Sequence, residues 1–154
     1  MSDSTHAADA IEFAVLNEIG IIAQLSAAAF EARLPEGMRL AHFRVLNHFV
    51  RLGGERSMVR LAAAFQVTKG AMTNTVGRLL ERGYVTVRPD PGDARAKLVS
   101  ITPEGEAARD AALAAMGAEL ARLRTAFAPE DWGAALPFLR ELRGWLDRDR
   151  DGGR

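Results

Sequence analysis

The sequence predicts a mainly α-helical protein with one small β-hairpin. Apolar residues recur every three or four positions over most of the 154 residues, as they do on the inner faces of helices. Two runs of alternating apolar residues, at 84–88 and 97–101, flank a segment rich in turn-forming residues, which indicates a hairpin. Two short helical patterns precede it. Short helices followed by a hairpin are the layout of a winged helix-turn-helix, here with longer helices on both sides.

Composition narrows the class of protein. The chain is 48% apolar, which is enough for a packed core in one compact unit. It contains no cysteine, so disulfides, thiolate zinc sites and cysteine-based redox switches are excluded. We expect no apolar run of membrane-spanning length and no secretory signal in the polar start. The simplest expectation is a cytoplasmic protein without a membrane partner.

Charge is distributed unevenly although the net charge is zero. Residues 51–102 contain nine Lys or Arg and four Asp or Glu, whereas residues 1–50 contain three and six. The middle of the chain is therefore basic and its flanks are acidic. A basic segment of this kind is the electrostatic footprint of nucleic-acid binding.

The first helices are expected at 8–34 and 38–52. Pro35 and Gly37 end the first, and Gly53 closes the second. The apolar stripe of the first helix is too wide for one neighbouring helix to cover. We therefore assign residues 8–36, together with 103–148, to a helical dimerisation part.

A short helix is expected from Thr68 to Gly83. The Thr68 hydroxyl can accept a backbone amide at the start of the helix, and Gly83 suits its end. The spacing of Met72, Val76, Leu79 and Leu80 predicts the inner face. The outer face carries small, polar and basic residues, as a helix in the major groove requires. A merely solvated face is the alternative. These outer residues are Lys69, Gly70, Thr73, Asn74, Gly77 and Arg78.

The hairpin supports the DNA-binding interpretation. Val85 and Val87 share one face of the first strand, and Val99 and Ile101 share a face of the second. The eight residues 89–96 are expected to form its tip. At this tip Arg95 can enter a minor groove, where negative potential attracts guanidinium. Asp93 can hold that guanidinium by a fork-like ion pair, although a chance ion pair in an exposed loop is the alternative.

The C-terminal third is expected to be helical. Thr102-Pro103-Glu104 has the capping hydroxyl, proline and acid typical of a helix start. A heptad-like apolar seam follows and predicts contact with a second chain. A final helix at 129–148 contains Pro137, where a kink or break is expected. Residues 38–102 form the predicted DNA-binding domain, and residues 1–7 and 149–154 the flexible termini. The seam consists of Leu113, Met116, Leu120, Leu123 and Phe127.

These motifs resemble those of the MarR family (multiple antibiotic resistance regulators). The likeness is strongest for Asp93-x-Arg95 followed by 98–102, and it includes Thr68-Lys69, Arg78-Leu79 and Gly83-Tyr84-Val85. It implies a homodimeric regulator, expected to be a repressor relieved by a small ligand, with 68–78 in the major groove and Arg95 in the minor groove. Asn74 departs from the basic residue of many members. The residues implied to contact DNA are Thr68, Lys69, Gly70, Ala71, Thr73, Asn74, Arg78, Asp93, Arg95 and Lys97.

The expected partner is double-stranded DNA with a pseudo-palindromic operator. The resemblance also suggests a small apolar or aromatic effector near Phe13, His42 and Leu46, for which plain core packing is the alternative. A winged-helix module that docks protein, or a small-molecule carrier without DNA readout, remains open. The scattered carboxylates and the three histidines, including His6 and His48, predict no catalytic site, no metal site and no cofactor.

Overall fold

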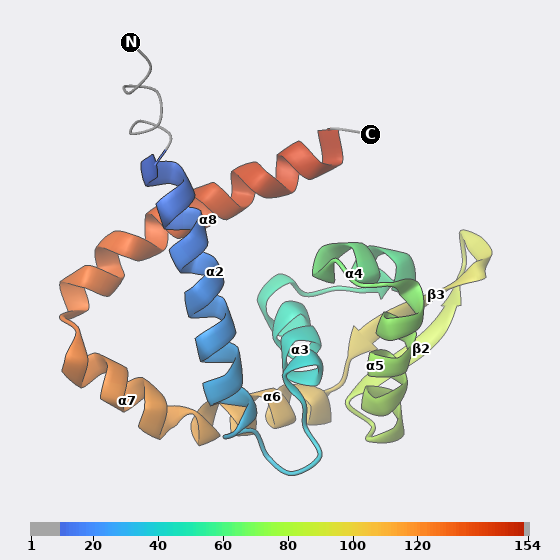
Figure 1. Cartoon of the computed structure of the whole chain (residues 1–154). Coiled ribbons are helices and arrows are strands. Elements are labelled where there is room, and N and C mark those ends of the chain that lie inside the picture. Colours follow the sequence, from blue (N-terminus) through green and yellow to red (C-terminus); the bar gives the residue numbers. More distant parts are fainter. Residues whose placement is uncertain (1–9, 153–154) are drawn as a thin grey trace. The chain divides into compact units, whose positions relative to one another are not determined.

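A computed structural model describes residues 10–152 of the chain (Figure 1). The predicted flexible segment 1–7, which includes His6, lies outside the described residues. The chain divides into two compact units, one ending at Met116 and the other beginning at Gly117.

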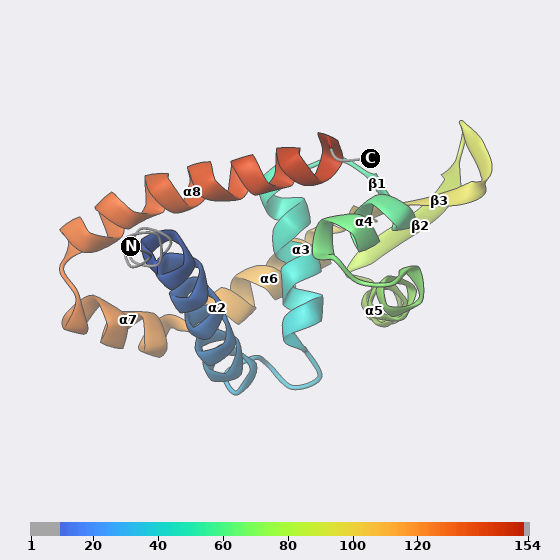
Figure 2. The ribbon, with the colours of Figure 1, turned by 45° about the horizontal axis from the view of Figure 1, so that its top comes forward.

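The first unit holds a three-stranded antiparallel sheet among its helices, as Figure 2 shows. The strand order is β1-β3-β2, and Val87 pairs with Val99 and Val85 with Ile101. This register confirms the predicted hairpin faces, whereas the two-residue strand β1 was not predicted. The elements are α2 (Ala10–Glu31), α3 (Leu40–Leu52), β1 (Arg56–Ser57), α4 (Met58–Phe65), α5 (Lys69–Glu81), β2 (Val85–Asp90), β3 (Asp93–Ile101) and α6 (Pro103–Ala115).

The core of this unit lies between α3, α4, α5 and the sheet. Met72, Val76 and Leu79 of α5 are buried, which confirms the predicted inner face of that helix. Leu80 was wrongly assigned to it, since 47% of its surface is exposed. One residue step turns the helix by about 100°, so Leu80 points away from the core that Leu79 enters. The most deeply buried side chains are Phe49, Leu46, Leu61, Leu79, Val45, Val76, Val85 and Val99.

The hairpin is longer than expected. Residues 89, 90 and 93–96 belong to the strands, and only Pro91 and Gly92 separate them. The side chain of Asp90 accepts a hydrogen bond from the Gly92 amide at 2.8 Å, which satisfies a donor in the turn and lets pairing continue to the tip. The predicted eight-residue tip is therefore wrong.

The junction of α6 with the sheet is tightly packed. The Thr102 hydroxyl accepts from the Gly105 amide at 3.0 Å and donates to the Gly83 carbonyl at 2.6 Å. The Thr102 amide donates to the Tyr84 carbonyl at 3.1 Å. The predicted Thr102 cap is confirmed, and it also ties α6 to the end of α5.

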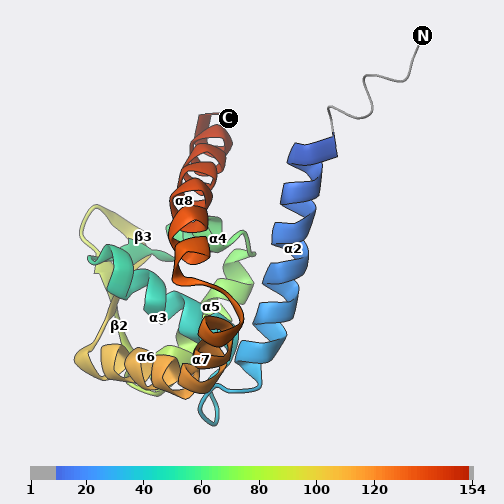
Figure 3. The same cartoon turned by 90° about the vertical axis from the view of Figure 1, so that its left-hand side faces the viewer.

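Helix α2 is joined to α3 at their adjacent ends (Figure 3). The Glu31 carboxylate accepts from the Leu40 amide at 2.6 Å and lies 3.5 Å from the Arg39 guanidinium. Most side chains of α2 are exposed in this chain. By length and composition alone, 11–31 is apolar enough to cross a membrane. The expectation that no run reaches that length is wrong, although such a helix near the N-terminus is weak support for a span.

The second unit consists of α7 (Gly117–Ala126) and α8 (Pro129–Gly152). The rings of Phe127 and Trp132 pack edge to face, with 5.7 Å between the ring centroids. Helix α8 continues through Pro137, so of the expected kink or break the break is wrong. It also runs to Gly152, so residues 149–152 of the predicted flexible tail are helical. The predicted seam is interrupted, because α6 ends before Met116, which is buried.

Candidate nucleic-acid interface

The helix-turn-helix is held by local hydrogen bonds. The Ser57 hydroxyl accepts from the Arg60 amide at 3.3 Å and starts α4. Helix α4 ends at Gln66, whose φ of 53° places a non-glycine residue in the left-handed region. The Thr68 hydroxyl then accepts from the Ala71 amide at 3.1 Å. The predicted Thr68 cap is confirmed, and it fixes where α5 begins.

Thr68→Ala is expected to lower the free energy of unfolding by about 1 kcal/mol, because the Ala71 amide loses its acceptor. Thr68→Ser keeps the hydroxyl and serves as the matched control. Urea unfolding followed by circular dichroism measures both. Equal loss in the two variants would show that the methyl group, not the cap, stabilises the turn.

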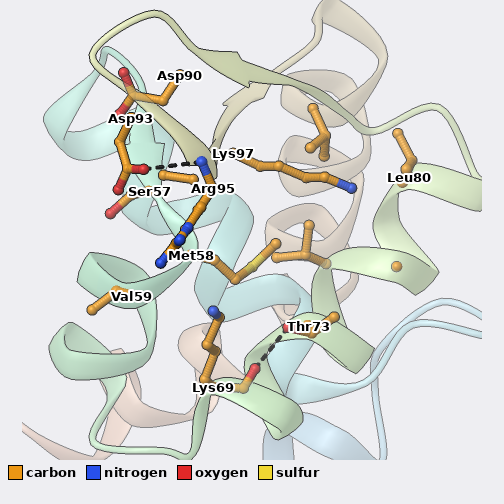
Figure 4. A pocket seen from close by; sticks show the side chains of 14 residues that line it. Ser57, Met58, Val59, Lys69, Thr73, Leu80, Asp90, Asp93, Arg95 and Lys97 are labelled. Carbon is orange, nitrogen blue, oxygen red and sulfur yellow. Dashed lines mark hydrogen bonds between the residues drawn. The ribbon is translucent and has the colours of Figure 1, made fainter.

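Every residue expected to contact DNA is exposed in this structure. Five of them line one groove of about 700 Å³ between α5, the start of α4 and the hairpin. In Figure 4 the side chains of Lys69 and Arg95 extend into the same space from opposite walls. The five are Lys69, Thr73, Asp93, Arg95 and Lys97.

The other five predicted residues are not in the groove lining but lie on α5 and its cap. They are Thr68, Gly70, Ala71, Asn74 and Arg78. The groove also has walls that were not predicted as site residues, among them Ser57, Met58 and Val59 at the start of α4. Nothing in the local sequence marks these three, because only the pairing of β1 with β3 brings them beside the hairpin.

Asp93 acts on the backbone and not on the guanidinium. Its carboxylate accepts from the Arg95 amide at 2.9 Å, and no ion pair between their side chains occurs in the described structure. The predicted fork-like pair is therefore wrong. The bond shapes the strand start, and the Arg95 side chain remains exposed for an outside anion.

Arg78 has an acid beside it on α5. Its guanidinium lies 3.2 Å from the Glu81 carboxylate, and both side chains are more than 60% exposed. Exposed pairs of this spacing contribute little to stability. The pair partly offsets the charge of Arg78.

A second ion pair ties the hairpin to the segment before β1. The Glu55 carboxylate accepts from both Nε and Nη2 of Arg88, with Nε at 2.7 Å. The hydrogen bond from Arg88 holds the pKa of Glu55 below its usual value. Arg88 is thereby bound within the chain, and its charge is offset at the base of the hairpin.

Stability is expected to fall in acid where Glu55 takes up its proton. Because the folded-state pKa is the lower one, the pair stabilises fully above the unfolded pKa, and this contribution disappears as pH falls through the folded pKa. Thermal unfolding of the protein and of Glu55→Gln from about pH 7 to about pH 3 measures the difference. The gap between the two should be widest at neutral pH and narrow in acid. A gap independent of pH would contradict this role.

The proposed effector residues are not brought together in this chain. Leu46 is fully buried. His42 lies near the start of α3, where its Nδ1 accepts from the Arg39 amide at 3.1 Å. Burial, and then nearby Arg82, lower its pKa. Phe13 is 71% exposed and lies about 27 Å along α2 from Glu31, at 1.5 Å per residue, whereas Glu31 contacts the start of α3.

Three further observations bear on the expected absences. His48 packs against the rings of Phe49 and Phe65, and burial lowers its pKa. Within residues 10–152, no three His, Asp or Glu side chains converge in a way that could hold a metal. In the described structure His42 accepts a hydrogen bond at the start of α3, and His48 packs against aromatic rings.

Comparisons with known proteins show which family the central part of the chain resembles. The sequence model of the MarR family matches residues 36–96. The multiple antibiotic resistance protein MarR of Salmonella typhimurium is 36% identical over 73 residues, which are 47% of this chain and 50% of that protein. The chain thus spans about half the length of the curated relatives it matches.

Solved structures extend the likeness over most of the chain. The transcriptional regulator BldR from Sulfolobus solfataricus is 26% identical, with a TM-score of 0.71 over 89% of this chain and 95% of that one. A mutant MarR from E. coli, solved in complex with operator DNA, is 25% identical, with a TM-score of 0.66 over 87% and 95%. With the match to the central segment, these structures show that the chain is similar to MarR-family transcriptional regulators and shares their winged-helix fold.

Proposed function

We propose that this chain is a cytoplasmic, homodimeric regulator that binds duplex DNA through α5 and the hairpin. The observation that carries the proposal is the groove in which Lys69, Arg95 and Lys97 from two separate elements face the same space. Phosphate attracts such cations, and the E. coli relative is a protein bound to operator DNA.

The dimensions of α5 suit the major groove. Its 13 residues span about 20 Å, and a bare helix fits the roughly 12 Å width of that groove. The hairpin tip then lies beside the helix, where Arg95 can follow the backbone into the adjacent minor groove. Helix and hairpin together divide the work into base reading and phosphate positioning.

Salt dependence separates this function from protein docking. Fluorescence anisotropy with a random duplex should show affinity falling steeply as salt rises, because bound cations release counterions from the DNA. A short pseudo-palindromic duplex selected from a random pool should bind more tightly. Absence of any salt-dependent binding would overturn the proposal and favour the alternative of a protein-interaction module.

Homodimerisation is proposed from exposed apolar helices in both units. Ile11, Phe13 and Leu25 of α2 are each at least 65% exposed. Trp145 and Phe138 of α8 are more than half exposed. Large apolar areas of this kind mark interfaces in soluble proteins. Two copies of one chain would also place two α5 helices on one duplex, about one turn apart.

Sedimentation of the protein at micromolar concentration tests this pairing. A dimer is expected, and Phe13→Asp should shift it toward monomer because a charge would enter an apolar interface. Glu12→Ala, at the neighbouring position, serves as the control. If the protein is a monomer, or if Phe13→Asp leaves the dimer unchanged, the exposed face of α2 is not the dimer interface.

Repression relieved by a small apolar or aromatic ligand is proposed from the resemblance to the MarR family. The geometry within one chain does not supply the pocket of Phe13, His42 and Leu46, so a ligand site at these positions would need a second subunit. Release of bound duplex by aromatic acids, followed by anisotropy, tests it. A small-molecule carrier would bind such ligands while showing no affinity for DNA.

A further inference from the structure

A strip without bulky side chains runs along the outer face of α5. Gly70, Asn74 and Gly77 follow one another at steps of four and three, so they share one side of the helix. That side is opposite Met72 and Val76, which are buried. Asn74 is thus the one side chain that projects from this strip, with a glycine one turn before it and one turn after it.

The glycines of this strip are not explained by packing within the chain. Gly77 lies in the helix interior, where glycine is less stable than alanine by about 0.5–1 kcal/mol, and Gly70 lies in the first turn. A Cβ on Gly77 would meet nothing within 4 Å, and one on Gly70 would meet only the Thr68 hydroxyl, at 4.0 Å. Neither has the positive φ that favours glycine. The advantage that offsets this destabilisation must lie outside the chain, where a surface approaches the helix closely.

The chemistry beside the strip favours one base pair. The exposed Asn74 amide makes no hydrogen bond to the described chain, and an amide pairs with both N6 and N7 of adenine. The Thr73 hydroxyl donates to the Lys69 carbonyl at 2.8 Å, so it offers a methyl group and an acceptor. Ala71 presents another methyl. Methyl groups pack against that of thymine. The first turns contain no arginine, and Lys69, which could also read guanine, lies in the groove lining shared with the hairpin.

We propose that the Gly70–Asn74–Gly77 strip enters deepest into the major groove and that Asn74 recognises an adenine, so each half-site centres on an A·T pair. This inference rests on the proposed DNA binding. It goes further in naming the base and in giving Gly77 the role of admitting Asn74 to the base edge.

The base assignment is tested by atom replacement in the DNA. In the best duplex selected from a random pool, replacing the central A·T pair by G·C should weaken binding about 5- to 150-fold. Replacing that adenine by 7-deazaadenine, which lacks N7 but still pairs with thymine, should also weaken binding. Asn74→Ala should lower affinity for the parent duplex and become indifferent to both replacements. An unchanged preference in Asn74→Ala would overturn the assignment.

The role of Gly77 is tested by opposite effects on folding and binding. Gly77→Ala and Gly77→Leu should raise the melting temperature, because both are better helix formers, yet weaken DNA binding, leucine more than alanine. Gly133→Ala in α8, where a Cβ also meets nothing within 4 Å, should raise the melting temperature with DNA binding unchanged. If Gly77→Leu leaves DNA binding unchanged, the proposed role of Gly77 is wrong.

Failure of this inference can be told from failure of the function. Salt-dependent binding to duplexes, without dependence on the central A·T pair or on Gly77, would overturn the inference alone. If the unmodified protein bound no duplex at any salt concentration, both would fall.

Discussion

Gly105→Ala is expected to lower the free energy of unfolding by roughly 3 kcal/mol, at the upper end of the cost of overpacking. A Cβ at Gly105 would lie 2.1 Å from the Tyr84 carbonyl oxygen and 2.9 Å from Cγ1 of Ile101. The carbonyl cannot retreat freely, because it accepts a hydrogen bond from the Thr102 amide. Relief of the clash would therefore separate α6 from the sheet.

Differential scanning calorimetry measures this loss as a fall of about 6–12 °C in the melting temperature, for a domain of this size. Gly133→Ala is the matched control, since its Cβ has open space and the change should raise the melting temperature slightly. A melting temperature unchanged by Gly105→Ala would mean that the α6 junction yields without cost.

Arg95→Ala is expected to weaken binding to every duplex by about 10- to 100-fold and to reduce the slope of affinity against salt by about one. The side chain is exposed at the hairpin end of the groove, and Asp93 holds only its backbone amide. Its charge is therefore available to the DNA backbone or the minor groove, and the loss should be independent of sequence.

Arg51→Ala removes an exposed cation of the same unit that is not in the groove lining, and it should change affinity little. Anisotropy titrations at several salt concentrations compare the two variants. Equal losses from both would indicate that overall charge, and not the position of Arg95, governs binding.

The sequence predicted the helices and the hairpin faces because burial imposes a period on the chain. Met72, Val76 and Leu79 show that period in α5, and Val85 and Val99 show it in the sheet. The prediction of buried faces and helix ends failed where the apolar spacing continues beyond the buried face or beyond the end of the helix. Leu80 continues the apolar run but lies past the edge of the buried face, and helix α6 ends before Met116 although the spacing continues.

The exposure of the proposed DNA-contact residues was predicted more fully than their contacts within the chain. All ten are exposed; seven belong to α5 and its cap and three to the hairpin strand β3. That they contact DNA stays a prediction. The partner of Asp93 was wrong, since spacing brings it near Arg95 but does not choose between the amide and the guanidinium. Gly105 and Glu31 were missed because their roles depend on how two elements meet: Gly105 packs against Tyr84, and Glu31 accepts from the start of the next helix.

The hydrogen bond that the Glu31 carboxylate accepts from the Leu40 amide lies at the C-terminal end of the long helix α2. Helix α2 has 22 residues and is therefore about 33 Å long. If α2 tilts by about 5° about this end, its N-terminal end moves by roughly 3 Å. The position of the far end of α2 therefore depends on the two oxygens of the Glu31 carboxylate, which contact Leu40 and Arg39.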